Sequence, residues 1–152
     1  MGGTTETSTN TDRLVVRTGD EHGAIRTSLI EAATALRELR EATAHLDVCV
    51  DELRGRLSEL DRWVTDHFAF EENDGLFELI RRSLPERESE VDRLAGEHAD
   101  MRATLERARV ALDDTVSPEL GSIIGALNHF TELLARHESV EENLMKELRE
   151  GK

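Results

Sequence analysis

The chain has 152 residues, enough for one domain with a single core, and its formal net charge of −14 argues against nucleic acid or an anionic membrane as a partner. Charged residues make up 34% of the chain and aromatic residues 3%, which is typical of long helices and unfavourable for a sheet. No apolar run approaches the roughly 18 residues of a membrane span, no signal-peptide pattern opens the chain, and the single Cys49 cannot form an internal disulfide. We therefore expect an acidic, soluble, cytoplasmic protein.

The first part of the chain differs in composition from the rest. Residues 1–18 are rich in Thr, Ser and Gly, which predicts a flexible N-terminal tail, although Leu14 and its two valine neighbours could pack on the body. Residues 19–152 are expected to form the domain. Asp20 is the predicted N-cap of its first helix, which runs to about Thr43.

Three further helices follow. The second is expected from Leu46 to about Arg82, with a kink at residues 73–75. The third has Pro85 in its first turn and continues to about residue 113, and Ser117 and Pro118 begin a fourth that ends near residue 151. Four long helices with short connections predict an all-α fold, an up-down-up-down four-helix bundle.

Each helix carries an apolar stripe whose members recur at steps of three and four residues, the spacing of a face turned toward a bundle core. Six polar residues occupy positions on these stripes where leucine is expected. They are His22, His67, Glu71, His98, His137 and Glu141. The two remaining histidines, His45 and His129, lie one residue off the stripe and are expected to face solvent.

An internal repeat relates the two halves of the chain. The segment "EHGAIR" at residues 21–26 resembles "EHADMR" at residues 97–102, and "HFAFEEN" at residues 67–73 resembles "HESVEEN" at residues 137–143. Each half therefore supplies one histidine from its first helix and a His-x-x-x-Glu pair from its second. An approximate two-fold relation would bring these groups face to face at one level of the bundle.

Buried carboxylates are unstable without a partner, so a cluster of four histidines and two glutamates needs a common one. A di-metal site in the core satisfies them, and mixed imidazole and carboxylate ligands favour iron or manganese over structural zinc. A single cation, or a buried polar network without metal, are the alternatives. Glu72 and Glu142, one residue past the presumed ligands, are expected to flank the site or to support its ligands from outside.

These motifs together resemble the hemerythrin-like, or HHE cation-binding, family over about residues 20–149. The resemblance implies a four-helix bundle with a carboxylate-bridged, non-haem di-iron centre, in which His22 and His67 bind one iron, His98 and His137 bind the other, and two glutamates bridge them. The bridging residues would be Glu71 and Glu141. Ferritin-like di-iron proteins use Glu-x-x-His motifs, which the sequence lacks at its stripe histidines.

One position departs from the oxygen carriers of that family. They have His-x-x-x-His on the third helix, whereas the position four residues after His98 is Arg102. Each iron implied by the resemblance would then keep an open position, and we expect binding of O2 or NO for sensing, storage or delivery. A di-iron enzyme acting on peroxide, NO or O2, and an iron-responsive sensor, are the alternatives. The acidic outer faces are consistent with a monomer or a weak homodimer.

Overall fold

The computed structural model describes residues 3–42, 46–113 and 119–150, and these residues form helices and no strand. The all-α prediction is confirmed. The helices, with one 3-10 turn, are α1 (Gly3–Glu41), α2 (Leu46–Asn73), α3 (Leu76–Ser83), η1 (Pro85–Arg87), α4 (Glu88–Leu112) and α5 (Leu120–Glu150).

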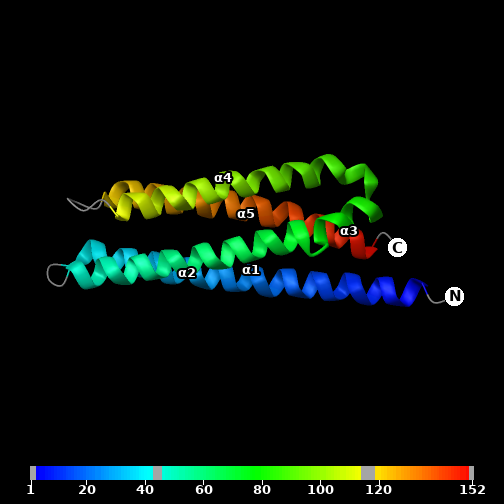
Figure 1. Ribbon diagram of the computed structural model, residues 1–152, viewed down its shortest axis with the longest axis horizontal. Coiled ribbons are helices and arrows are strands. Elements are labelled where there is room, and N and C mark those ends of the chain that lie inside the picture. The colour runs from blue at the N-terminus through cyan, green and yellow to red at the C-terminus, as the bar shows by residue number, and fades with distance from the viewer. Residues whose placement is uncertain (1–2, 43–45, 114–118, 151–152) are drawn as a thin grey trace.

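The four long helices form an up-down-up-down bundle (Figure 1). Consecutive long helices run antiparallel, and α1 packs beside α2 and α5 while α4 packs beside α2 and α5. The short helix α3 lies at the end of the bundle where the described chain begins and ends. This order places residues from all four long helices around one axis, as the sequence spacing predicted.

The first helix begins earlier than predicted. It starts at Gly3 rather than at Asp20, so residues 3–18, expected as a tail, are helical and continuous with the domain. Leu14 is 6% exposed and packs in a core cluster, and the Thr18 hydroxyl donates a hydrogen bond to the Leu14 carbonyl. Tertiary burial of this turn outweighs the weak helix propensity of the Thr- and Ser-rich segment.

The predicted kink in the second helix is a full break. Helix α2 ends at Asn73, and Gly75 has a φ of 106°, a left-handed backbone conformation that glycine adopts without steric penalty. The chain then turns into α3 before α4 begins. The predicted start of the last helix at Ser117 and Pro118 lies outside the described residues.

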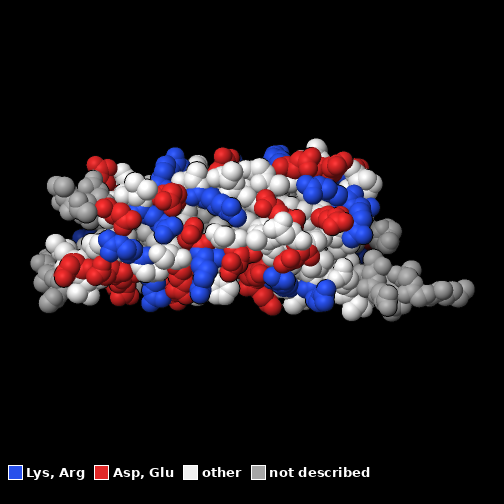
Figure 2. Space-filling view, viewed as in Figure 1, with Lys and Arg blue, Asp and Glu red and all other residues white. Residues whose placement is uncertain are grey.

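Two apolar clusters fill the interior and lie on either side of a polar layer. The larger cluster includes Leu57, Phe130 and Leu105 from three long helices. The smaller cluster surrounds α3 and includes Leu14, Phe77 and Leu94. The outer surface is charged, and Figure 2 shows acidic and basic side chains interspersed along one face. Within the described part of the chain, no helix is long and apolar enough to cross a membrane.

Candidate metal centre

The structure brings all six predicted site residues together between the two apolar clusters. One comes from α1, one from α4 and two each from α2 and α5, and none is more than 3% exposed. The i, i+4 spacing on α2 and α5 directs a histidine and a glutamate from each helix toward the bundle axis. These residues are His22, His67, Glu71, His98, His137 and Glu141.

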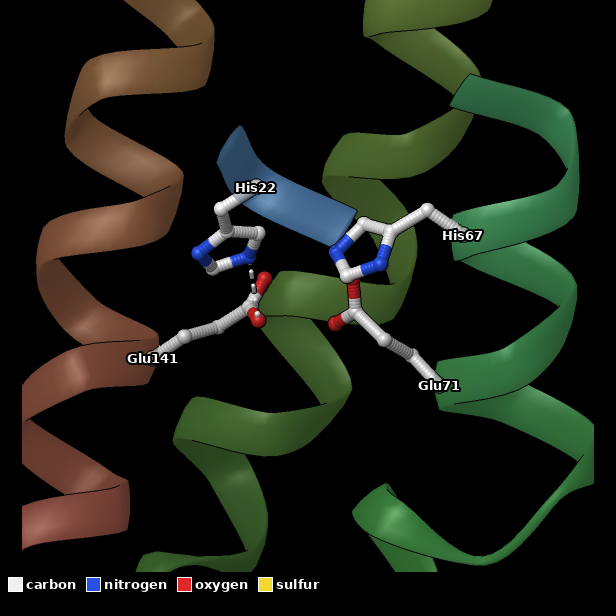
Figure 3. A group of neighbouring side chains, drawn as sticks. All are labelled: His22, His67, Glu71 and Glu141. Carbon is white, nitrogen blue, oxygen red and sulfur yellow. Dashed lines mark ion pairs between the residues drawn. The ribbon is translucent and has the colours of Figure 1, made fainter. Parts of the chain in front are cut away.

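Four of these side chains form the first group that could hold a cation. One ligand atom each from His22, His67, Glu71 and Glu141 lie within 4.8 Å of one another. Figure 3 shows the two imidazole rings side by side, with His22 next to Glu141 and His67 next to Glu71. His67 Nε2 is 2.6 Å from a Glu71 oxygen, and His22 Nε2 is 3.5 Å from a Glu141 oxygen.

A second group shares a carboxylate with the first. Ligand atoms of Glu71, His98 and His137 lie within 4.8 Å of one another. The Nε2 atoms of His98 and His137 are 3.3 Å apart, and each is 3.9 Å from the same Glu71 oxygen. His137 Nε2 also contacts Glu141 on its own helix. The two groups therefore adjoin, with Glu71 and Glu141 between two pairs of histidines.

The carboxylates at the centre contact histidine nitrogens but make no hydrogen bond. Both oxygens of Glu71 and both oxygens of Glu141 are buried without a hydrogen-bond partner, and so are the Nε2 atoms of His22 and His67. Buried polar atoms in proteins are normally paired, because an unpaired one costs roughly 1–3 kcal/mol. Two cations bound between the four histidines and two glutamates would satisfy these atoms, so the donor set fits a dinuclear site.

Three of the four histidines are held from behind by a second carboxylate. The Nδ1 atom of His67 lies 2.8 Å from a Glu21 oxygen, and that of His137 lies 2.9 Å from a Glu97 oxygen. The Nδ1 atom of His98 lies 3.1 Å from a Glu72 oxygen. Such carboxylates fix the tautomer and orientation of a histidine that binds metal through its other nitrogen.

The pKa values of the buried histidines are shifted in opposite directions by their surroundings. Burial favours the neutral form of His67, but the carboxylates of Glu21 and Glu71 outweigh it and raise the pKa to about 9. The pKa of His137 is raised to about 10, because the two buried carboxylates outweigh desolvation in the same way. Burial, followed by the neighbouring His137, lowers the pKa of His98 to about 3.

The pKa values of the two central carboxylates, Glu71 and Glu141, are also shifted in opposite directions. Burial, followed by the charge of Glu141, raises the pKa of Glu71. Burial acts in the same direction on Glu141, but its contacts with His137 and His22 outweigh burial and lower its pKa. A pair of adjacent buried carboxylates of this kind is stabilised by bound cations, which remove the repulsion between them.

Aromatic rings cover one side of the centre. The Phe68 ring stacks on His98 with 3.8 Å between ring centroids and 6° between the planes. Phe77 stacks on the same histidine at 5.6 Å. Arg102, at the position where the oxygen carriers resembled by the sequence have a fifth histidine, is exposed and places its guanidinium 5.7 Å from the Phe68 ring.

The remaining sequence predictions have different outcomes. His129 is exposed as expected, and His45 lies outside the described residues. Glu72 supports a site histidine, as expected of a flanking carboxylate. Sequence reasoning missed Glu21 and Glu97, although each directly precedes a site histidine in the repeated "EH" motif. Their partners lie on neighbouring helices, so local spacing could not reveal the contacts.

An all-α bundle with a buried histidine and carboxylate cluster able to hold cations defines a class of helical metal-binding domains. A family model described as hemerythrin HHE cation binding domain matches residues 15–148. The chain belongs to the hemerythrin HHE cation-binding family, which confirms the resemblance inferred from its motifs. No curated protein and no solved structure matches the chain.

Proposed function

We propose that the chain is a non-haem di-iron protein that binds O2, or NO, for sensing, storage or delivery. In this proposal His22 and His67 hold one iron and His98 and His137 hold the other. Glu71 bridges the two irons, together with Glu141. The ligand set suits both iron and manganese, and the resemblance of the sequence motifs to di-iron members of the family supports iron.

The observation that carries the proposal is the pairing of two adjoining ligand groups around unpartnered carboxylates. The groups share Glu71, and the other central carboxylate, Glu141, contacts histidines from both. A single cation would leave one pair of histidines without a ligand role. A network without metal would leave four buried carboxylate oxygens that contact histidine nitrogens but make no hydrogen bond.

The surrounding side chains exclude water from the centre. Ile25, Val64, Met101 and Phe130 are fully buried in the cluster that adjoins the polar layer. A dry, apolar wall of this kind limits access of protons to a bound gas. Iron, when bound, would supply the electrons and the open coordination positions for a diatomic ligand.

The proposal is tested by the visible absorption of the anaerobically reduced, iron-loaded protein while oxygen is admitted and then removed. We expect a charge-transfer band that appears with oxygen and fades when oxygen is withdrawn. The matched variants are His137→Ala, which removes a proposed ligand, and His129→Ala, which removes an exposed histidine from the same helix.

The band should be lost in His137→Ala and kept in His129→Ala. A band that persists after oxygen is removed would contradict reversible binding and would direct attention to redox chemistry. Oxygen evolution on addition of peroxide would also contradict a binding role and would support an enzyme. The measurement therefore separates binding from turnover on a single preparation.

A further inference from the structure

The two halves of the site differ at the residue that follows the histidine of the His-x-x-x-Glu pair. The aligned repeats place Phe68 after His67 and Glu138 after His137. Phe68 is fully buried and stacks on His98. Glu138 is only 7% exposed, so the internal repeat replaces a buried aromatic ring with a buried carboxylate.

One oxygen of Glu138 is paired and the other is not. Oε2 accepts hydrogen bonds from Nε and Nη2 of Arg26 at 3.3 and 3.2 Å. Oε1 is buried without a hydrogen-bond partner. A charge-assisted contact therefore holds the carboxylate at the junction of α1 and α5 and leaves one oxygen free to accept a proton donor.

His22 lies close to the Glu138 carboxylate. One ring nitrogen of His22 and one carboxylate oxygen from each of Glu138 and Glu142 lie within 4.8 Å of one another. Figure 3 shows that His22 directs one ring nitrogen at Glu141 and turns the other toward α5, the helix that carries Glu138. Glu138 Oε1 has no hydrogen-bond partner and is therefore available to accept a proton from that ring nitrogen.

The repeat predicts a different partner for His22. Its counterpart His98 is held at Nδ1 by Glu72, whose aligned residue is Glu142. Glu142, however, is 59% exposed and lies 3.8 Å from Arg26, whereas Glu138 is buried. A buried carboxylate makes the stronger contact, because water does not compete for its oxygens.

We propose that Glu138, rather than Glu142, is the carboxylate that orients His22 for metal binding. It accepts the Nδ1 proton of His22, which leaves Nε2 for the cation, while Arg26 holds its other oxygen. Glu138 is thus a positioning residue that acts through His22. The inference rests on the proposed function for its metal, and its structural part is testable without one.

The experiment measures Fe(II) affinity and stoichiometry by competition with a chelator under anaerobic conditions. The variants are Glu138→Leu, Glu138→Gln and the matched control Glu142→Leu. Loss of the carboxylate in Glu138→Leu should lower the affinity for one of the two irons by roughly 10- to 100-fold. Glu138→Gln keeps an acceptor oxygen and should stay within about threefold of the wild type, as should Glu142→Leu.

A metal-free measurement separates this inference from the proposed function. In protein labelled with ¹⁵N-histidine, Glu138→Leu should shift the Nδ1 resonance of His22, and Glu142→Leu should not. Circular dichroism of the metal-free variants checks that each remains folded. If the wild type binds no iron, the proposed function fails, but the Nδ1 resonance still shows whether His22 contacts Glu138.

Three results would overturn the inference. A larger loss of affinity in Glu142→Leu than in Glu138→Leu would assign the role to the residue that the repeat predicts. Equal losses in Glu138→Leu and Glu138→Gln would make Glu138 a direct ligand, because an amide oxygen replaces a ligating carboxylate poorly. An unshifted Nδ1 resonance of His22 in Glu138→Leu would show that the contact does not form.

Discussion

The Nε2 atoms of His98 and His137 face each other at 3.3 Å in the centre of the bundle. Two imidazole nitrogens at this distance cannot both carry protons without repulsion, and burial together with His137 lowers the pKa of His98 to about 3. A cation between the rings accepts a lone pair from each. At His98 the geometry of the core therefore favours metal binding over protonation.

Removal of Glu71 should abolish the stabilisation of the protein by iron. Glu71→Leu puts an apolar side chain of similar size in place of a fully buried carboxylate that both ligand groups share. In the metal-free protein the change removes a costly buried carboxylate but also an ion-pair partner of His67, so we expect the free energy of unfolding to stay within about 2 kcal/mol of the wild type. Thermal unfolding with and without Fe(II) measures both effects.

The exposed Glu132 on α5 gives a control for the Glu71 substitution. Glu132→Leu should leave the increase of melting temperature on iron addition as it is in the wild type. For the wild type, a metal concentration of 100 times Kd should add about 2.7 kcal/mol of stability. A Glu71→Leu protein that iron still stabilises fully would contradict the bridging role.

The carboxylates behind the histidines should contribute to metal affinity without touching the metal. Glu21→Leu and Glu97→Leu each remove the charge-assisted contact to the Nδ1 atom of a buried histidine. We expect each to lower Fe(II) affinity by roughly 10-fold or more, with similar effects because the two positions are equivalent in the repeat. Competition with a coloured chelator measures the loss. Asp20→Asn, at an exposed position beside Glu21, should have no effect.

The stability of the metal-free protein should fall as pH rises above neutrality. The folded-state pKa values of His67 and His137, about 9 and about 10, lie above the ordinary value of 6.5. The folded state therefore holds more protons than the unfolded state between about pH 6.5 and 10. The stabilisation is fully present below pH 6.5 and is lost as pH rises through the folded values, on the order of 2 kcal/mol or more.

The composition makes this alkaline transition easy to assign. The chain has no tyrosine, and its lysines are Lys146 and Lys152. Urea unfolding of the metal-free protein should give a lower free energy of unfolding at pH 10.5 than at pH 7. This difference should be smaller in His67→Gln. It should be absent from the iron-loaded protein, because metal replaces the protons on the histidines. Equal stability at both pH values without metal would count against these buried ion pairs.

The N-terminal extension of α1 should contribute to the stability of the domain. Leu14 is buried in the cluster around α3, whereas Val16, two residues later, is 63% exposed. Leu14→Ala should lower the free energy of unfolding by about 2 kcal/mol, because it removes buried apolar area and leaves a cavity. Val16→Ala is the control and should change it by less than about 0.5 kcal/mol. Equal effects, measured by urea unfolding, would show that this turn does not pack as described.

The sequence predicted the bundle and the position of the polar layer because both depend on local periodicity. Steps of three and four residues place Glu71 and Glu141 on the same face as the leucines, whatever the fold details. The early start of α1 could not be predicted in this way. Its Thr- and Ser-rich composition disfavours a helix locally, and the burial of Leu14 against distant residues outweighs that preference.

The outer carboxylates show the same limit of local reasoning. Glu21 belongs to α1 but contacts His67 on α2, and Glu97 belongs to α4 but contacts His137 on α5. Such contacts depend on the rotation of each helix about its axis and on side-chain rotamers. The replacement of Phe68 by Glu138 in the repeat was visible in the sequence, but its meaning required the position of Arg26.

The most direct test of the account is an anaerobic titration of the metal-free protein with Fe(II), with bound iron counted per chain and its environments resolved by Mössbauer spectroscopy. The account predicts saturation at about two irons per chain, both lost in Glu71→Leu and both kept in Glu132→Leu. Saturation at a single iron, or two irons that remain in Glu71→Leu, would contradict a carboxylate-bridged pair in the bundle core.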